Sequence, residues 1–248
     1  MSLGVWYEAQ VVDIQDLSPE VKEFTFRLAG DAPFDYEPGM FVTFDLPIHE
    51  KRLHRMRSYS IASYPLTENR LIKFCIGNLN GGLASTFWFS KEIEIGSVLK
   101  FRGPQGHFLV PKTSLPDATL VLICTGTGIA PFKAIMEKYE LYPHLNQWGK
   151  INLIFGTRFQ NNILYKDFFD MLVAKYDWFD YDITLSKDSN WPGNKGYVHR
   201  IYEKHYVKNE LQNYFFMICG SNLMLQEAHK NLINKGINIT NLKSESYN

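Results

Sequence analysis

The chain has 248 residues, of which 45% are hydrophobic and 21% are charged. This is ordinary for a globular protein of one large or two modest domains, and it excludes a disordered or collagen-like chain. Lys plus Arg and Asp plus Glu each number 26, so the basic excess typical of nucleic-acid-binding proteins is missing. Aromatic residues make up 15% of the chain, enough for a core and for stacking on flat ligands.

Three widely separated cysteines, Cys75, Cys124 and Cys219, form neither a disulfide framework nor an iron–sulfur motif. A reducing compartment is the simpler interpretation. The sequence shows no signal peptide and no apolar run near the roughly 20 residues that span a bilayer. We therefore expect a cytoplasmic protein without membrane insertion. His199 and His205 lack ligand spacing, so we predict no metal site.

Short runs rich in β-branched and aromatic residues fill the first part of the chain, and turn residues separate them. These runs are Val21–Leu28, Met40–Leu46, Arg57–Ala62, Leu71–Gly77 and Val98–Arg102. One segment, Gly82–Phe89, instead carries apolar residues at a helical spacing. Many strands with a single short helix predict a small antiparallel β-barrel, which we assign to residues 1–113.

Residues 114–248 alternate buried-type strands with longer helical stretches. The predicted strands are Thr119–Cys124, Ile151–Phe155, Tyr181–Leu185 and Phe215–Cys219, and helices follow from about Ile129, Tyr165, Val198 and Leu223. Such alternation predicts an α/β domain with a parallel sheet covered by helices on both faces. The fold class is therefore two domains, an N-terminal β-barrel and a C-terminal α/β domain, with residues 111–116 as the linker.

The strongest motif, Cys124–Pro131, directly follows a predicted strand and opens a helix. Its Gly126 and Gly128 let backbone amides approach a pyrophosphate, and the N–H groups of a helix start favour an anion. Pro131 stands where the dinucleotide fingerprint has its third glycine. The alternative is a tight turn before an unrelated helix, but the strand and helix context favours a nucleotide site.

Two motifs in the predicted barrel suit a phosphate or a flat ring. On a strand, Arg57 could bind a phosphate while Tyr59 stacks on a heterocycle; ordinary cross-strand packing is the alternative. The segment Asn80–Thr86 brings glycines and hydroxyls to a helix start, which presents donors to an anion. A simple capped helix explains that segment equally well.

Two segments near the C-terminus carry further candidates. Cys219 follows a predicted strand and precedes a helix, where open α/β sheets bind ligands; a small buried hydrophobe is the alternative. The tail places a carboxylate, Glu245, and a ring, Tyr247, near the chain end. Polar chain ends are usually just frayed.

Together these motifs resemble the ferredoxin–NADP reductase superfamily over essentially the whole chain. In that family a flavin-binding barrel carries R-x-Y-S and then a G-G-x-x-S helix start. A nucleotide domain follows with G-T-G-I-A-P and C-G-x-x-x-M, and plant-type members end near E-x-Y. All five are present here in the family's order. One departure is Asn248, because plant-type members end at the aromatic residue.

The resemblance implies an enzyme, a flavoprotein oxidoreductase that transfers hydride between NAD(P)H and bound FAD. The residues implied to bind FAD are Arg57, Ser58, Tyr59, Ser60, Gly82, Leu83, Ser85, Thr86 and Tyr247. Those implied to bind NAD(P)H are Thr125, Gly126, Thr127, Gly128, Arg158, Ser186, Lys187, Cys219, Gly220 and Met224. The implied catalytic residues are Ser60 near flavin N5, Cys219 facing the nicotinamide, and Glu245 completing the proton and charge environment.

The choice between NADH and NADPH stays open. Ser186 and Lys187 occupy the position of an S-R pair in NADP-using members, and Arg158 offers a second cation for the extra phosphate. Lys lacks the bidentate fork of Arg, however. The segment Trp191–His199 is similar to the W-x-G-x-x-G-[YF]-V-H stretch of NADH-using oxygenase reductases, which tips our expectation towards NADH.

The electron acceptor also stays open. These 248 residues hold no cysteine quartet for a fused [2Fe–2S] domain, so we expect a separate acceptor: ferredoxin, flavodoxin, an oxygenase component or free flavin. A flavin reductase that releases reduced flavin and a non-catalytic nucleotide-sensing flavoprotein are the alternatives. We expect a monomer. The basic segment Arg52–Arg57 could be a partner surface, part of the flavin-phosphate site or a solvated face.

Overall fold

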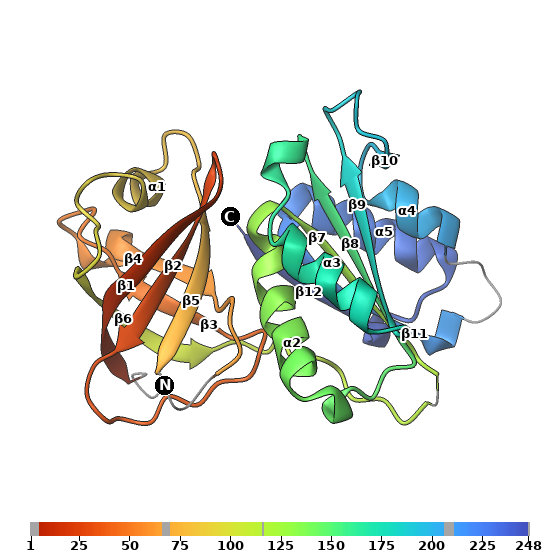
Figure 1. The fold of residues 1–248 in the computed structure, drawn as a ribbon, viewed down its shortest axis with the longest axis horizontal. Coiled ribbons are helices and arrows are strands. Elements are labelled where there is room, and N and C mark those ends of the chain that lie inside the picture. The colour runs from red at the N-terminus through yellow and green to blue at the C-terminus, as the bar shows by residue number, and fades with distance from the viewer. Residues whose placement is uncertain (1–4, 66–69, 116, 206–210, 248) are drawn as a thin grey trace. The chain divides into compact units, whose positions relative to one another are not determined.

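The computed structural model describes residues 5–65, 70–115, 117–205 and 211–247. Pro116, at the end of the expected linker, and Asn248 lie outside these ranges. The chain forms two compact units (Figure 1). Unit 1 comprises Met1–Leu109 and Ala130–Lys138, and unit 2 comprises Val110–Ile129 and Tyr139–Asn248. Each unit is described separately below.

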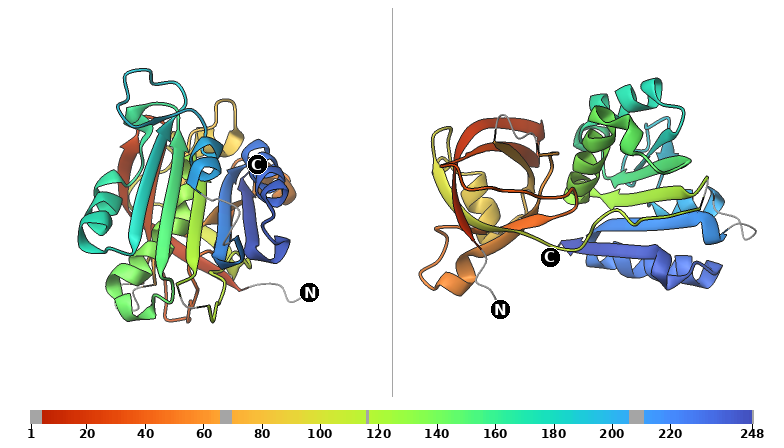
Figure 2. Two further views of the ribbon diagram at one scale, coloured as in Figure 1. Left: turned by 90° about the vertical axis from the view of Figure 1, so that its right-hand side faces the viewer. Right: turned by 90° about the horizontal axis from the view of Figure 1, so that it is seen from below.

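Unit 1 contains a six-stranded antiparallel sheet that curls into a barrel (Figure 2). Its strands are β1 (Trp6–Ser18), β2 (Val21–Leu28), β3 (Phe41–Asp45), β4 (Met56–Ser60), β5 (Leu71–Gly77) and β6 (Val98–Gln105), in the order β4-β3-β6-β1-β2-β5. An isolated bridge between Ile61 and Phe74 joins the end of β4 to β5. The 3-10 helix η1 (Arg52–Arg55) precedes β4, and the short helix α1 (Leu83–Trp88) follows β5. The predicted barrel is confirmed.

Aromatic rings fill this barrel, because alternate residues of each strand point inward. The fully buried rings include those of Phe24, Phe26, Phe44, Phe74, Trp88 and Phe101. The ring of Phe44 lies 5.4 Å from that of Phe26, 5.0 Å from Phe74 and 5.2 Å from Phe101, centroid to centroid. Such aromatic pairs add about 0.5–1.5 kcal/mol each beyond the burial of their area. The cluster therefore holds β2, β3, β5, β6 and α1 together.

Unit 2 contains a six-stranded parallel sheet in the order β10-β9-β8-β7-β11-β12. Its strands are β7 (Thr119–Thr125), β8 (Lys150–Thr157), β9 (Phe179–Leu185), β10 (Asn194–Lys195), β11 (Tyr214–Ser221) and β12 (Leu242–Tyr247). Its helices include α3 (Lys166–Lys175), α4 (His199–His205) and α5 (Asn222–Lys235). The helix α2 (Ala130–Leu141) has its residues Ala130–Lys138 in unit 1. Short 3-10 helices intervene at η2 (Gly126–Ile129), η3 (Pro143–Leu145), η4 (Gln160–Asn162), η5 (Leu211–Asn213) and η6 (Ile239–Asn241).

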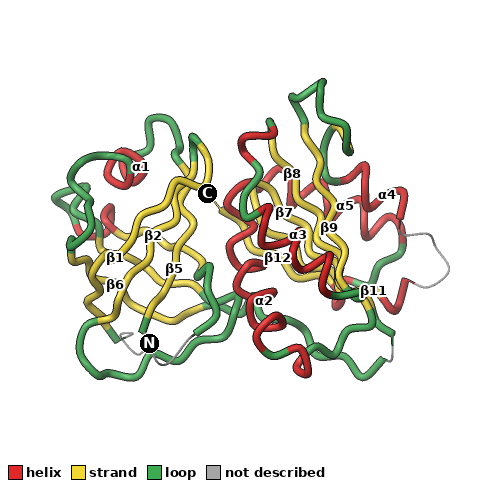
Figure 3. Tube along the Cα trace, in the orientation of Figure 1, coloured by secondary structure: helices red, strands yellow, loops and turns green. Residues whose placement is uncertain are grey.

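Helices cover both faces of this sheet, which explains why its central strand β7 is apolar almost throughout. Figure 2 shows α3 on one face and α4 and α5 on the other. The side chains of residues 120–124 in β7 are fully buried. Figure 3 contrasts this alternation of helices and strands with the barrel of unit 1, where α1 is short. The predicted α/β architecture is confirmed.

The C-terminal tail is a strand rather than a frayed end. Residues 242–247 form β12, which pairs in parallel with β11 and places Glu245 opposite Cys219 and Tyr247 opposite Ser221. The polar sequence of the tail conceals this strand, because an edge strand needs backbone hydrogen bonds to one neighbour only. The alternative interpretation of the tail, a frayed polar end, therefore does not hold for these residues.

We predict that Phe44→Ala lowers the free energy of unfolding by about 3–5 kcal/mol, because it opens a cavity inside the ring cluster. The control is Leu53→Ala, since Leu53 is 83% exposed and its loss should change stability by less than about 0.5 kcal/mol. Urea unfolding followed by circular dichroism measures both variants. Equal effects of the two substitutions would contradict the role given to Phe44.

Candidate functional site

The residues implied to bind NAD(P)H gather at one edge of the unit 2 sheet. All strands of a parallel sheet end on the same side, and open α/β sheets bind ligands there, where the strand order reverses direction. In unit 2 the chain runs from β7 outward through β8 to β9, and it returns on the other side of β7 as β11 (Figure 1). The reversal therefore lies between the ends of β7 and β11.

Two glycines let the turn after β7 approach the end of β11 closely. A Cβ on Gly128 would stand 2.3 Å from the carbonyl oxygen of Cys219, and a Cβ on Gly220 would stand 2.5 Å from Thr125 Oγ1. Gly128 faces backbone atoms, so no side chain fits there. Gly220 faces the Thr125 and Met224 side chains, and its φ of +154° favours glycine. At Gly126, where φ is +53°, a Cβ would meet nothing within 4 Å. The turn therefore packs against β11 on one side and leaves free space at Gly126 on the other. Its backbone N–H groups could donate to a diphosphate in that space.

The side chains around this turn come from two helices. Thr127 lies in η2, half-buried beside the open Gly126. Met224 lies in the first turn of α5, and its Cε would stand 2.7 Å from a Cβ on Gly220. The Met224 N–H donates to Ser221 Oγ at 3.4 Å, which caps that helix. The structure therefore brings together the predicted residues of both segments.

Further along the same edge lie two exposed cations on neighbouring loops. Arg158 follows β8 and Lys187 follows β9, and the Lys187 N–H donates to the Arg158 carbonyl oxygen at 3.0 Å. Ser186 Oγ donates to the Thr157 carbonyl oxygen at 3.3 Å. Tyr197, just after β10, exposes 65% of its surface. Sequence reasoning did not select Tyr197, although an exposed ring within the Trp191–His199 motif is a signal for ligand stacking.

The pairing of β12 with β11 brings Glu245 and Tyr247 to Cys219. Burial raises the pKa of the Cys219 thiol, a hydrogen bond with Tyr247 opposes this rise, and the Glu245 carboxylate adds to it. The thiol is therefore protonated at neutral pH. It offers a neutral S–H contact, whereas a nucleophile or metal ligand would need the thiolate. Cys124, opposite Cys219 on β7, is equally buried.

The residues of the R-x-Y-S motif lie on β4 and face in two directions. Arg57 is paired with the inward-facing Phe44 of β3. Arg57 and Tyr59 therefore lie on the inward face of β4, whereas Ser58 and Ser60, which alternate with them, lie on the other face. Ser58 is exposed, and Ser60 is 5% exposed at the strand's end. A planar ligand that contacts both Tyr59 and Ser60 therefore has to lie across the end of β4.

The Tyr59 and Arg57 side chains are both held by internal hydrogen bonds. The indole N–H of Trp88 donates to Tyr59 Oη at 2.7 Å. Burial raises the pKa of Tyr59 to about 12, opposed by this hydrogen bond and by the charge of Arg57. Arg57 Nη1 donates to the carbonyl oxygens of His54 at 3.1 Å and Met56 at 2.8 Å. Sequence reasoning missed Trp88, because an apolar position inside a short helix indicates core and reveals no partner.

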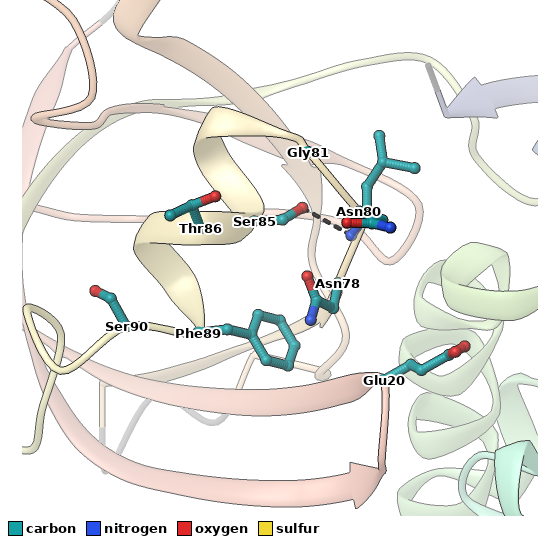
Figure 4. Close-up of a pocket in the computed structure, with 9 residues that line it drawn as sticks. Glu20, Asn78, Asn80, Gly81, Ser85, Thr86, Phe89 and Ser90 are labelled. Carbon is teal, nitrogen blue, oxygen red and sulfur yellow. Dashed lines mark hydrogen bonds between the residues drawn. The ribbon is translucent and has the colours of Figure 1, made fainter.

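Beside the start of α1 lies a cavity of about 560 Å³ (Figure 4). Its lining comes from the β1–β2 turn, the loop before α1 and one face of α1: Glu20, Asn78, Leu79, Asn80, Gly81, Ser85, Thr86, Phe89 and Ser90. Ser85 Oγ accepts the Leu79 N–H at 2.9 Å, so it stabilises the turn from within. Thr86 Oγ1 donates to the Gly82 carbonyl oxygen at 3.1 Å, and Leu83 is 55% exposed.

The basic segment before β4 is partly neutralised by its own surroundings. Asp45 lies 2.6 Å from Arg55 Nε and 3.6 Å from Arg52 Nε. The Arg52 guanidinium also lies 5.0 Å from the centroid of the Trp6 ring. These contacts order the segment, and they leave Arg57 as the basic side chain carried by β4 itself.

Comparison with known proteins agrees with both halves of this description. Residues 8–109 match the family model of the oxidoreductase FAD-binding domain, and residues 122–230 match that of the oxidoreductase NAD-binding domain. Ferredoxin–NADP reductase B of Sorangium cellulosum is 32% identical over 196 residues, which are 77% of this chain and 75% of that protein. The chain belongs to the ferredoxin–NADP reductase superfamily. It is an oxidoreductase with an FAD-binding and an NAD-binding domain.

Other members of the superfamily extend the comparison. The phenol hydroxylase P5 protein of Acinetobacter pittii is 28% identical over 92% of this chain, but the chain spans only 61% of that protein's length. A crystal structure of a ferredoxin NADP+ reductase from Neisseria gonorrhoeae, with bound FAD and NADP, matches with a TM-score of 0.80 at 19% identity. That match covers 97% of this chain and 98% of the other, which shows a common fold.

The described residues fit the two cofactors that the family binds. In unit 2 the glycine turn leaves no room for side chains towards β11 and is open at Gly126, as close approach of a dinucleotide backbone requires. In unit 1 the cavity at the helix start is lined by the side-chain amides of Asn78 and Asn80, since the Thr86 and Ser90 hydroxyls donate to nearby backbone carbonyl oxygens, and β4 supplies a guanidinium and a phenol. These are donors that phosphate and flavin can use.

We predict that Gly128→Ala abolishes nicotinamide nucleotide binding and lowers stability by about 1–3 kcal/mol, because the new methyl group collides with the β11 backbone. Gly30→Ala is the matched control outside the nucleotide site, because Gly30 has a φ of +66° and a Cβ there would meet nothing within 4 Å. It should cost about 1–2 kcal/mol for its positive φ and clash with nothing. Thermal unfolding and nucleotide titration test the pair. Unimpaired binding by the Gly128 variant would contradict the close approach described here.

Proposed function

We propose that the protein is an NAD(P)H-dependent flavoprotein reductase that passes electrons from bound FAD to a separate small redox protein or oxygenase component. One observation carries this proposal: the Thr125–Gly128 turn, Cys219 and Glu245 lie together at the edge of the nucleotide-binding sheet. The FAD-binding domain of the same chain carries the R-x-Y-S strand.

The protein's own contribution is to bind and orient two flat rings. Bound FAD supplies the redox chemistry, since a flavin accepts a hydride and returns electrons singly. Thr125, Gly126 and Thr127 would hold the nucleotide diphosphate through backbone and hydroxyl groups. Arg57 would bind a flavin phosphate, and Tyr59 would lie against the flavin ring. Positioning of this kind can account for a large part of a rate enhancement.

Three residues would shape the place where the rings react. The buried Cys219 thiol would border the nicotinamide as a neutral group. Tyr247, hydrogen-bonded to that thiol, would cover the nicotinamide position until a nicotinamide displaces it. Glu245, opposite Cys219 in the sheet, would hold the proton and charge balance beside the nicotinamide, and Ser60 is proposed separately as a residue near flavin N5. None of these roles needs a covalent nucleophile, in keeping with the raised pKa of Cys219.

The names of the relatives support a separate protein acceptor. One is a ferredoxin–NADP reductase and another is a phenol hydroxylase component, and this chain spans three quarters of the first and 61% of the second. Among the described residues, no helix is long and apolar enough to cross a bilayer. The monomeric state and the cytoplasmic location stay predictions.

Anaerobic titration of the purified protein with NADH and NADPH in parallel tests the proposal. We expect protein-bound flavin whose visible absorbance bleaches on nucleotide addition and returns when an oxidised ferredoxin is added. Flavin that is lost on purification and consumed as a substrate would instead indicate a flavin reductase. A colourless protein that shows no bleaching with either nucleotide after addition of FAD would disprove the proposed function.

We predict that replacing both Arg158 and Lys187 by Ala raises the KM for NADPH by about tenfold or more, because two phosphate-facing cations are lost. The KM for NADH should change less than about twofold, since NADH lacks the extra phosphate. Lys175→Ala is the control, because Lys175 pairs with Glu140 at 2.8 Å. Parallel losses for both nucleotides would show that the cations do not read the 2′-phosphate.

A further inference from the structure

Trp88 occupies an unusual place in the barrel of unit 1. It is the last residue of α1, it is 1% exposed, and its ring packs against those of Phe24 at 4.9 Å and Phe44 at 5.5 Å. Within this apolar cluster its indole N–H is a polar group that needs an acceptor. The acceptor is Tyr59 Oη on β4, at 2.7 Å.

We propose that Trp88 is a positioning residue for the flavin: it holds the Tyr59 ring in one orientation and so couples the R-x-Y-S strand to the helix that begins at the glycine turn. The inference rests on the proposed function, because it takes Tyr59 as the residue that lies against the flavin. Trp88 itself lies outside the motifs that carry the resemblance to the family.

The geometry around Tyr59 leaves the ring little freedom. The Trp88 ring stands at 90° to it with centroids 5.7 Å apart, and the Phe44 ring stands at 66° with centroids 6.0 Å apart. Two edge contacts and one hydrogen bond therefore define the tilt of the phenol. Tyr59 is only half-buried, so part of the ordered ring stays accessible to a ligand.

Rotation of Tyr59 out of this position is opposed by the indole itself. If the phenol moved, the Trp88 N–H would be buried without an acceptor, and an unpaired buried donor is costly. Tyr59 Oη accepts from Trp88, so its own hydrogen is left to donate elsewhere. Burial raises the pKa of Tyr59 to about 12, and the phenol therefore keeps that hydrogen at neutral pH.

A phenylalanine at position 88 would still place a ring in the cluster but would remove the hydrogen bond. We expect Trp88→Phe to raise the Kd for FAD by about tenfold, because FAD binding must then itself order the Tyr59 ring and loses free energy in doing so. Titration of flavin-free protein with FAD, followed by flavin fluorescence, measures this Kd. The visible spectrum of the bound FAD, which responds to stacking on Tyr59, should change as well.

Phe87→Leu is the matched control. Phe87 lies on the same helix, is 6% exposed and packs against Trp88 with ring centroids 5.5 Å apart, so its truncation loosens the core but keeps the hydrogen bond. Its Kd for FAD should stay within about twofold of the unmodified protein. A tenfold loss in this variant too would overturn the proposal, because general loosening of α1 would then explain the effect.

A double-mutant cycle with Tyr59→Phe completes the test. If Trp88 acts through the Tyr59 hydroxyl, Trp88→Phe should change the Kd little in the Tyr59→Phe background. If the two substitutions instead raise the Kd for FAD by independent factors that multiply in the double variant, the proposal is overturned. Should Trp88→Phe fail to fold, Tyr59→Phe alone decides: an unchanged Kd and spectrum would overturn it, and a tenfold weaker Kd would support it. Failure of the unmodified protein to bind FAD would instead refute the proposed function itself.

Discussion

The close approach of the turn after β7 to the backbone of β11 is the constraint on which the nucleotide domain depends. Gly128 lies so near the carbonyl oxygen of Cys219 that no side chain fits between them. Because β11 also pairs with β12, this contact places the turn, the buried thiol and Glu245 at one edge of the sheet. Segments more than a hundred residues apart in the sequence thereby form one site.

The FAD-binding domain reaches a rigid site by a different route. The residues proposed to bind FAD lie on a strand and at a helix start, and aromatic packing behind them links the two. The hydrogen bond between Trp88 and Tyr59 extends this packing to a candidate ligand residue. Backbone proximity thus organises one domain, and side-chain packing organises the other. In both domains the candidate site residues are ordered before the ligand binds, which lowers the entropic cost of binding.

The electrostatics of both sites agree with chemistry that the cofactors perform. The Cys219 thiol and the Tyr59 phenol are kept neutral by burial, which raises both pKa values. Neutral groups beside the cofactor rings add no charge of their own, so the change of charge during the reaction is carried by the flavin and the nicotinamide. The candidate cations Arg158 and Lys187 are exposed, and Arg57 is half-buried. Phosphate groups can reach the two exposed side chains while those stay partly hydrated.

Much of this protein could be derived from its sequence, because the relevant signals are local. Apolar periodicity is set by how neighbouring side chains face in a strand or helix, so the barrel, the alternating domain and most element positions could be predicted. The Cys124–Pro131 motif likewise predicted a strand, a turn and a helix. Pro131 lies in the first turn of α2, where its missing N–H costs little stability.

Contacts between distant segments were decided only by the tertiary structure. The pairing of the polar tail with β11 and the hydrogen bond from Trp88 to Tyr59 both join parts of the chain that no periodicity relates. A sequence pattern records whether a residue is apolar or polar, whereas a site depends on which partner the fold brings within hydrogen-bonding distance. That choice is made by the packing of the whole chain, and it therefore appears only in three dimensions.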